Sequence, residues 1–358
     1  MSACSTCLLR SWLLGRLASH LEPVRNRLDD LLALPDPALI EAVGGGREGD
    51  VSAQARRLNI GELRARSAAA GLELICACDP AYPARLRDLE SPPAVLHVGG
   101  SLEHFLELVA GEPVAVVGAR RASDYGLEAA RTLGRGLGSA GVTVVSGMAL
   151  GVDSAAHGGA LEVSGPTVAV LPAGAERPYP PGKSALYRRI RARGAVVSEL
   201  PPGTAVWRWS FHARNRIIAA LSAMTVVVEG RERSGALVTA RHARELGRPV
   251  GAVPGRITAP MAAGPNALLA AGATIVRGPQ DVLDALFGAG ARSAPDRARE
   301  ALEPELSRVL DAVGGGHDTI AALARAGVAA DRALSALSAL ELAGYVRREA
   351  GGRYVVVP

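Results

Sequence analysis

The feature that most constrains the fold of this chain is a series of short, Val-rich runs that alternate with helical patterns. Each run is continuous rather than alternating in polarity, as expected of strands buried on both faces of a sheet. Segments such as residues 127–141 have the length and composition of helices and separate the runs. This repeated strand–helix–strand pattern predicts a Rossmann-like, doubly wound α/β fold with a mostly parallel sheet. The predicted strands lie at residues 113–118, 142–147, 166–174, 194–200, 224–230, 248–255 and 273–278.

Two smaller domains are expected on either side of this core. Leucines recur at helical spacing before residue 70, with breaks at prolines and glycines, which predicts a small N-terminal helical domain. After a stretch rich in Gly, Ala, Arg and Pro, the chain shows three helical patterns and a two-stranded ribbon, which is the pattern of a winged helix. The predicted domains are helical 1–70, Rossmann-like core 71–287, linker 288–303 and winged helix 304–358.

The role of the predicted winged helix stays open at this point. Its third helix is the usual reader of a DNA groove, but Arg332 is the only cation near the start of that helix. Contact with DNA and contact with another protein are therefore both consistent with its sequence.

Composition limits the classes of function only loosely. The 358 residues carry a formal charge of +5, and Lys183 is the only lysine, so nearly every cation is a guanidinium. Guanidinium groups suit phosphates and flat bases, although this excess is mild. Aromatic residues make up 3%, which argues against a platform of many stacking rings. We expect no membrane span and no secretory signal, and four cysteines in so long a chain indicate a reducing cytoplasm.

Three glycine-rich turns follow predicted strands, at residues 118–123, 146–151 and 229–235. In open α/β sheets, ligands bind beyond the carboxyl ends of the strands, where loops lead into helix N-termini. Glycine allows backbone N–H groups to approach an anion, and Ser, Thr and Arg add donors. The turns therefore predict a phosphate pocket, although tight strand-to-helix connections alone would also require glycines. The predicted phosphate-contacting residues are Gly118, Arg120, Arg121, Ser123, Ser146, Gly147, Ser234, Gly235 and Thr239.

The common nucleotide motifs are broken. Arg120 stands where the dinucleotide fingerprint requires its second glycine, and Arg177 stands where a P-loop ending at Lys183 would require its first. An NAD or ATP enzyme is therefore disfavoured. Asp153 and His157 lie four residues apart, on one helix face, where polar anchoring is a simpler role than catalysis. Glu199 and Glu229 end strands and could form a carboxylate pair. Because so many arginines lie nearby, we expect them to orient arginines instead, and we predict no catalytic residue.

The segment 207–222 concentrates the scarce aromatic residues beside arginines, at the entry to an apolar helix. Rings interleaved with guanidinium groups provide stacking surfaces and phosphate neutralisation, which single-stranded nucleic acid requires. Alternatively, one or more rings fill the edge of the sheet. The candidate nucleic-acid residues of this segment are Phe211, Arg214, Asn215 and Arg216.

Several motifs in a fixed order resemble the DprA/Smf DNA-processing family. They include VAVVGARRASDYG, SGMALGVDSAAHGGAL, FHARNRIIAALS and VVVEGRERSGALVTARHARELGRPVGAVPG, and the match covers about residues 72–280. The resemblance implies a homodimeric, non-enzymatic single-stranded DNA-binding protein. Such a protein protects incoming DNA and loads the RecA recombinase during natural transformation.

The same resemblance implies roles for individual residues. Arg120 and Ser123 would bind phosphate, and Ser146 and Gly147 would shape the pocket. The DNA path would be lined by Lys183, Arg214, Asn215 and Arg216. Two positions depart from the family pattern: His212 stands where proline is usual, and Lys183 where asparagine is expected.

Two other functions remain open from the residues. Phosphoribohydrolases share this style of loop, but they need a motif that places a catalytic glutamate, and the segment SGALVTA at 234–240 has none there. A protein-contact scaffold with a vestigial pocket is the other alternative.

The four cysteines form two close pairs. Cys4 and Cys7 have C-x-x-C spacing, and Cys76 and Cys78 flank Ala77. Each pair is able to reach one metal ion, so a structural zinc site is conceivable if the two segments pack together. Free thiols are the simpler expectation, and we predict no other cofactor.

Overall fold

The computed structural model describes residues 3–293, 302–342, 345–349 and 351–356. The chain divides into two compact units, Met1–Ala294 and Pro295–Pro358. In the described part of the chain, no helix has the length and apolar character that a membrane crossing requires.

The larger unit is built on a nine-stranded sheet with the order β1-β2-β6-β5-β4-β3-β7-β8-β9. Neighbours from β6 to β9 are parallel, which confirms the mostly parallel doubly wound sheet. β1 pairs antiparallel with β2, and β2 antiparallel with β6, at one edge. The strands are β1 (Leu72–Cys76), β2 (Val95–Gly99), β3 (Val114–Val117), β4 (Val144–Ser146), β5 (Thr167–Val170), β6 (Ala195–Ser198), β7 (Met224–Val227), β8 (Val250–Ala252) and β9 (Thr274–Ile275).

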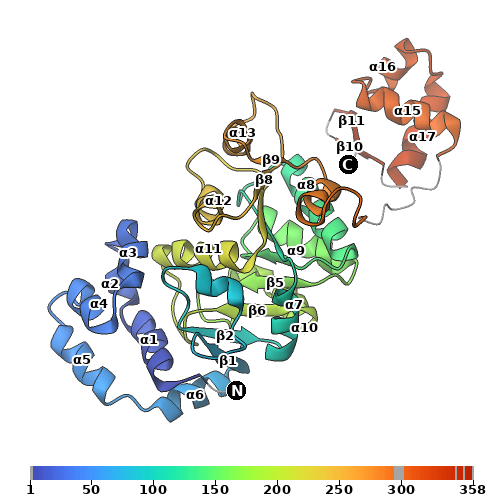
Figure 1. Ribbon diagram of the computed structural model, residues 1–358. Helices are drawn as coiled ribbons and strands as arrows, with labels where there is room; N and C mark the ends of the chain where they lie inside the picture. The colour runs from blue at the N-terminus through green and yellow to red at the C-terminus, as the bar shows by residue number, and fades with distance from the viewer. Residues whose placement is uncertain (1–2, 294–301, 343–344, 350, 357–358) are drawn as a thin grey trace. The chain divides into compact units, whose positions relative to one another are not determined.

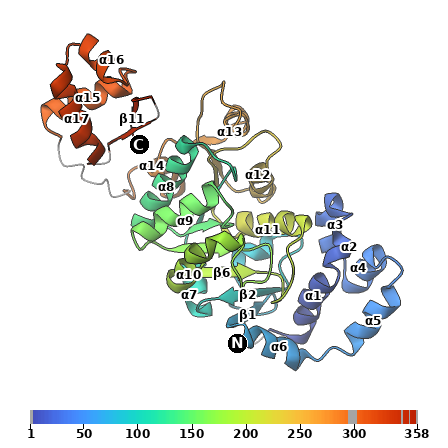
Figure 2. The ribbon, with the colours of Figure 1, turned by 180° about the vertical axis from the view of Figure 1, so that it is seen from behind.

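Helices cover both faces of the sheet, which explains the continuous apolar runs. In β3, Val114 and Val116 pack into one hydrophobic cluster and Ala115 and Val117 into another, because successive side chains point to opposite faces. α8 and α9 lie side by side on one face, and α11 and α12 pack together on the other (Figures 1 and 2). The helices of the two layers are α7 (Leu102–Ala110), α8 (Asp124–Ser139), α9 (Val152–Glu162), α10 (Ser184–Arg193), α11 (Arg208–Leu221), α12 (Gly235–Glu245), α13 (Ala263–Ala270) and α14 (Pro279–Phe287).

The N-terminal helices share a core with the α/β part. Their buried leucines form one cluster with Leu200, Trp209 and Ala213. Trp209 is fully buried, and its indole Nε1 donates to the carbonyl of Ala18 at 2.8 Å. The helices are therefore joined to the core through α11. They are α1 (Ser5–Arg16), α2 (Ala18–Leu21), α3 (Leu28–Ala33), α4 (Asp36–Val43), α5 (Glu48–Arg56) and α6 (Ile60–Ala69).

The smaller unit is the expected winged helix. Three helices, α15 (Pro304–Gly314), α16 (Ile320–Arg325) and α17 (Ala330–Leu342), precede the antiparallel pair β10 (Val346–Arg348) and β11 (Tyr354–Val356). It has a hydrophobic cluster of its own, with Val309, Leu323, Leu337 and Tyr354 at the centre. Arg332 near the start of α17 lies 3.9 Å from Glu305, so this cation already has an acidic neighbour.

Candidate nucleic-acid interface

The glycine-rich turns converge at one edge of the sheet. Residues 118–123 follow β3, 147–151 follow β4, 171–183 follow β5, and 228–234 follow β7. Because these strands are parallel and adjacent, their carboxyl ends meet, and we call these four segments the strand-end loops. The chain adds strands to one side of β3 up to β6, and to the other side from β7 on. The loops after β3 and β7 therefore flank the point where the winding direction changes, where open α/β sheets bind ligands.

A cation and two rings meet at these loops. The guanidinium carbon of Arg120 lies 4.4 Å from the ring centroid of Phe211. The ring of Tyr179 lies 5.5 Å from Phe211, tilted by 58°. These residues come from the loop after β3, the start of α11 and the loop after β5, and Arg120 is exposed while both rings are half-buried. Sequence reasoning singled out Arg120 and Phe211 but missed Tyr179, whose only signal was its rarity as an aromatic residue.

Arg214 supports the loop after β4 from inside the protein. Its Nη1 donates to the carbonyl of Val170 at 3.1 Å and lies 3.9 Å from Asp153 Oδ2. A Cβ on Gly147 would lie 1.1 Å from that Nη1, so only glycine allows the contact. Burial lowers the pKa of Arg214 to about 10, Asp153 opposes this, and the charge of Arg120 adds to it. Arg214 therefore holds a loop in place, and it lies on α11 with Phe211, the ring that Arg120 contacts.

Asp153 and His157 are anchors, as expected from their shared helix face. Asp153 accepts hydrogen bonds from the backbone N–H groups of Gly147 at 3.1 Å and Ala149 at 3.3 Å. Burial raises the pKa of this carboxyl, and the Arg214 charge opposes the rise. His157 Nδ1 lies 2.6 Å from Thr167 Oγ1, and burial lowers its pKa to about 3.

Ser146 and Ser123 both have partners within the protein. The Ser146 hydroxyl is fully buried and donates to the carbonyl of Val116 at 2.7 Å, which ties β4 to β3. Ser123 caps α8, and Glu229 accepts from both its N–H at 2.8 Å and its hydroxyl at 2.6 Å. The carboxylate of Glu229 thus lies at the helix N-terminus where the sequence reasoning expected a phosphate.

The structure places the remaining residues of α11 and α12 largely in the interior. Arg216 pairs with Glu199 and its side chain is 4% exposed, so a direct contact between Arg216 and DNA is incompatible with this arrangement. Asn215 donates to the carbonyl of Gly235 at 3.2 Å and joins α11 to α12. Thr239 is buried in α12. Ser234 precedes α12, and its buried hydroxyl has no hydrogen-bond partner among the described residues.

Arg121 and Lys183 differ from this interior group. Arg121 is exposed beside Arg120, and Lys183 is half-buried at the end of the short 3-10 helix η3 (Pro181–Lys183). Gly118 lies at the base of the loop after β3, where a Cβ would approach Val152 to 2.6 Å. Most of the predicted residues therefore fall into an outward group, Arg120, Arg121, Lys183 and Phe211, and an inward group that shapes the loops. Ser123 and Gly235 are exposed but take part in hydrogen bonds within the protein.

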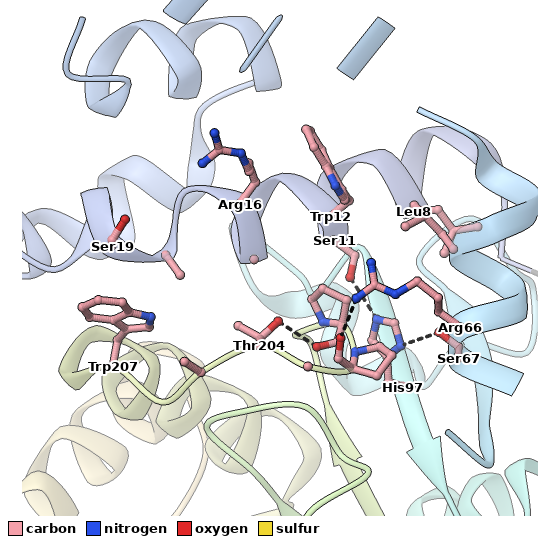
Figure 3. A pocket seen from close by; sticks show the side chains of 17 residues that line it. Leu8, Ser11, Trp12, Arg16, Ser19, Arg66, Ser67, His97, Thr204 and Trp207 are labelled. Carbon is pink, nitrogen blue, oxygen red and sulfur yellow. Dashed lines mark hydrogen bonds between the residues drawn. The ribbon is translucent and has the colours of Figure 1, made fainter. Parts of the chain in front are cut away.

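A cavity of about 380 Å³ lies at a different place, between α1, α6 and residues 201–207 (Figure 3). Its floor contains His97, whose Nε2 lies 2.9 Å from Ser11 Oγ and whose Nδ1 lies 3.4 Å from Ser67 Oγ. Burial lowers the pKa of His97 to about 3. The cavity is lined by none of the strand-end loops and is no part of the predicted phosphate pocket.

The cysteine segments do come together. Sulfur atoms of Cys4, Cys7 and Cys78 all lie within 4.8 Å of one another, and this cluster could hold a metal ion. Cys76 is next to it, and its Sγ accepts from the N–H of Cys4 at 3.4 Å.

Comparison with known proteins identifies the family. Residues 73–287 match the model of DNA recombination-mediator protein A, and residues 293–352 match the DprA winged helix domain. A putative DNA processing protein DprA from Mycobacterium tuberculosis is 42% identical over 267 residues, covering 73% of this chain and 68% of that protein. DprA from Bacillus subtilis is 35% identical over 216 residues, covering 60% and 72%.

Solved structures agree with the sequence relatives. DprA from Streptococcus pneumoniae has a TM-score of 0.64 and 30% identity, covering 79% of this chain and 98% of that one. DNA processing protein A from Helicobacter pylori, solved to study its single-stranded DNA binding mode, has a TM-score of 0.54 and 28% identity, covering 61% and 97%. With its α/β core, its winged helix and its strand-end loops, the chain belongs to the DprA/Smf family of DNA-processing recombination mediators.

Proposed function

We propose that this protein binds single-stranded DNA at the strand-end loops. The observation that carries the proposal is the contact of Arg120 with Phe211, next to Tyr179 and the exposed Arg121. Single-stranded nucleic acids are held by cations along the sugar–phosphate backbone and by rings on which bases stack, with little dependence on sequence. The Helicobacter pylori relative, which binds single-stranded DNA, supports the same assignment here.

The inward group serves this interface indirectly. Arg214 and Asp153 set the path of residues 147–149 from below, and Asn215 links α11 to the start of α12. Substituting these residues would test folding of the loops rather than contact with DNA. The outward group is therefore the right target for a binding experiment.

The test is titration of a fluorescent oligo-dT with the full chain and its variants at several salt concentrations. Arg120→Ala should weaken binding and reduce the slope of log affinity against log salt by about 0.7 for each phosphate that the variant no longer neutralises. Phe211→Ala should weaken binding by about 1–3 kcal/mol, because the bases lose a stacking surface. Arg56→Ala removes an exposed arginine on α5 and is the matched control. Wild-type affinity in both Arg120→Ala and Phe211→Ala would refute the proposal.

In this proposal, the interface holds DNA without making or breaking covalent bonds. Glu229 follows β7 at these loops and is the carboxylate by which we test the hydrolase alternative; it accepts two hydrogen bonds from Ser123 and so has a structural role. Incubation with a panel of nucleoside monophosphates should release no free base. Base release that is abolished by Glu229→Gln would favour the hydrolase instead.

Membership of the family supports a proposal about its partners. We expect a homodimer that acts in the cytoplasm, protects incoming DNA and loads RecA onto it during natural transformation and recombination. Light scattering would measure the dimer. RecA strand exchange on DNA coated with single-strand-binding protein would measure loading, and Arg120→Ala should reduce both DNA binding and loading.

A further inference from the structure

The cysteine cluster brings together two distant segments of the chain. Cys4 is the N-cap of α1 and Cys7 lies in its first turn, whereas Cys78 follows the end of β1. Cys7 Sγ and Cys78 Sγ are 3.7 Å apart although the residues are separated by 71 positions. The cluster is therefore a product of the tertiary fold.

The spacing of the sulfur atoms matches metal ligands rather than a disulfide. A tetrahedral zinc with Zn–S bonds of about 2.3 Å places neighbouring sulfurs about 3.8 Å apart. A disulfide requires a separation of about 2.05 Å. The 3.7 Å between Cys7 Sγ and Cys78 Sγ is close to the edge length of a zinc–thiolate tetrahedron, and all three sulfurs lie within 4.8 Å of one another.

The surroundings also suit a metal. Cys4 and Cys7 both lie at the start of α1, so one short segment presents two of the three sulfur atoms. Cys7 is buried while Cys78 is exposed, so the cluster is shielded on one side and has an entry path on the other. Cys76, the remaining cysteine of the chain, lies outside this mutual spacing of 4.8 Å, and its Sγ accepts a hydrogen bond from the backbone N–H of Cys4.

We propose that Cys4, Cys7 and Cys78 bind a structural zinc ion, with Cys76 as the fourth ligand. On binding, each thiol releases its proton to solvent and forms one Zn–S bond, so no oxidant or reductant is needed. The ion would clamp the beginning of α1 to the end of β1, and so join the N-terminal helices to the edge of the sheet. The site uses none of the strand-end loops, so it is independent of the proposed DNA binding.

The experiment measures metal content, thiol reactivity and thermal unfolding of the full chain, purified under reducing conditions from zinc-supplemented cells. We expect one zinc per chain by mass spectrometry, protection of the cysteines from a thiol reagent, and a lower midpoint of unfolding after chelation. Cys7→Ser and Cys78→Ser should lose the zinc and the effect of the chelator, and Cys76→Ser should weaken zinc binding. Ser5→Ala, an exposed substitution between Cys4 and Cys7, should keep the zinc.

Several results would contradict the zinc site. Reactive thiols in the absence of bound metal, stoichiometric iron in place of zinc, or a Cys7–Cys78 disulfide found by peptide mapping would each overturn the proposal. Full zinc occupancy in Cys78→Ser would do the same. Because oligo-dT binding is measured on the same variants, failure of the zinc site and failure of the DNA site are distinguishable.

Discussion

Single residues at the strand-end loops divide by the direction of their side chains. Arg120 faces outward over Phe211, whereas Arg214 is buried beneath Gly147. Both are arginines beside glycines or aromatic residues in the sequence, and nothing in their neighbours distinguishes them. The difference lies in their burial and in the groups that they contact: Arg120 is exposed, whereas Arg214 is buried and holds a loop.

The contact between Gly147 and Arg214 predicts that replacing Gly147 by a larger residue lowers the stability of the protein. Gly147→Ala would place a Cβ at 1.1 Å from the buried guanidinium and should destabilise the protein by about 1–3 kcal/mol through overpacking. Gly158→Ala, in α9 with no atom within 4 Å of the added Cβ, is the control and should stabilise by up to about 1 kcal/mol. Urea unfolding measures both, and equal stabilities would contradict the contact.

Buried histidines predict a dependence of stability on pH. Burial lowers the pKa of His97 and of His157 from 6.5 to about 3 in the folded protein. Between these values the unfolded chain binds more protons, so stability should fall as the pH drops below about 6.5, by up to about 1.4 kcal/mol per pH unit for each histidine.

The variant His157→Gln removes one of these titrating groups. Its plot of unfolding free energy against pH should be flatter than that of the wild type between about pH 6 and about pH 4, inside the interval that the folded and unfolded pKa values define. Parallel curves for His157→Gln and wild type would show that His157 does not carry this dependence.

At the scale of elements, the N-terminus of α8 is stabilised by a distant strand end. Glu229 follows β7, yet its carboxylate accepts from the N–H and hydroxyl of Ser123. A negative charge at a helix N-terminus interacts favourably with the helix dipole, so this contact ties the loops after β3 and β7 together. The winding of the sheet brings these two strands side by side.

Ser123→Ala should therefore cost more than the removal of an ordinary helix cap. Removing a Ser cap costs about 1 kcal/mol, and here the substitution also removes a charge-assisted bond to Glu229. The matched control is Ser101→Ala. Ser101 caps α7, and its hydroxyl accepts one hydrogen bond, from the backbone N–H of His104. Chemical denaturation of both variants tests the difference, and a larger destabilisation in Ser101→Ala would contradict it.

At the scale of the whole molecule, the chain divides into two compact units, and the first contains both the predicted helical domain and the predicted core. The helices before residue 70 share a hydrophobic cluster with Leu200, Trp209 and Ala213, whereas the winged helix has its own cluster around Leu337. The predicted domain boundaries at 70 and 287 follow changes in pattern. Packing joins the first two segments into one compact unit.

This shared core makes Trp209 a structural residue. Trp209→Ala should destabilise the larger unit by about 3–5 kcal/mol, because the indole is fully buried and donates to Ala18. Trp207→Ala removes a half-buried ring at the edge of the Figure 3 cavity and should cost less. Thermal unfolding followed by circular dichroism measures both variants, and a destabilisation by Trp207→Ala as large as that by Trp209→Ala would argue against the shared core.

The sequence by itself determined the parallel core, the winged helix and the family. Strand and helix periodicities, glycine turns and motif order are properties of neighbouring residues, so they can be read without coordinates. Only the tertiary structure decided that Arg214 and Arg216 face inward, that Glu229 caps α8, that Tyr179 joins Phe211, and that Cys4, Cys7 and Cys78 meet. These contacts join residues far apart in the chain, and the path of the sheet and the packing of its helices bring them together.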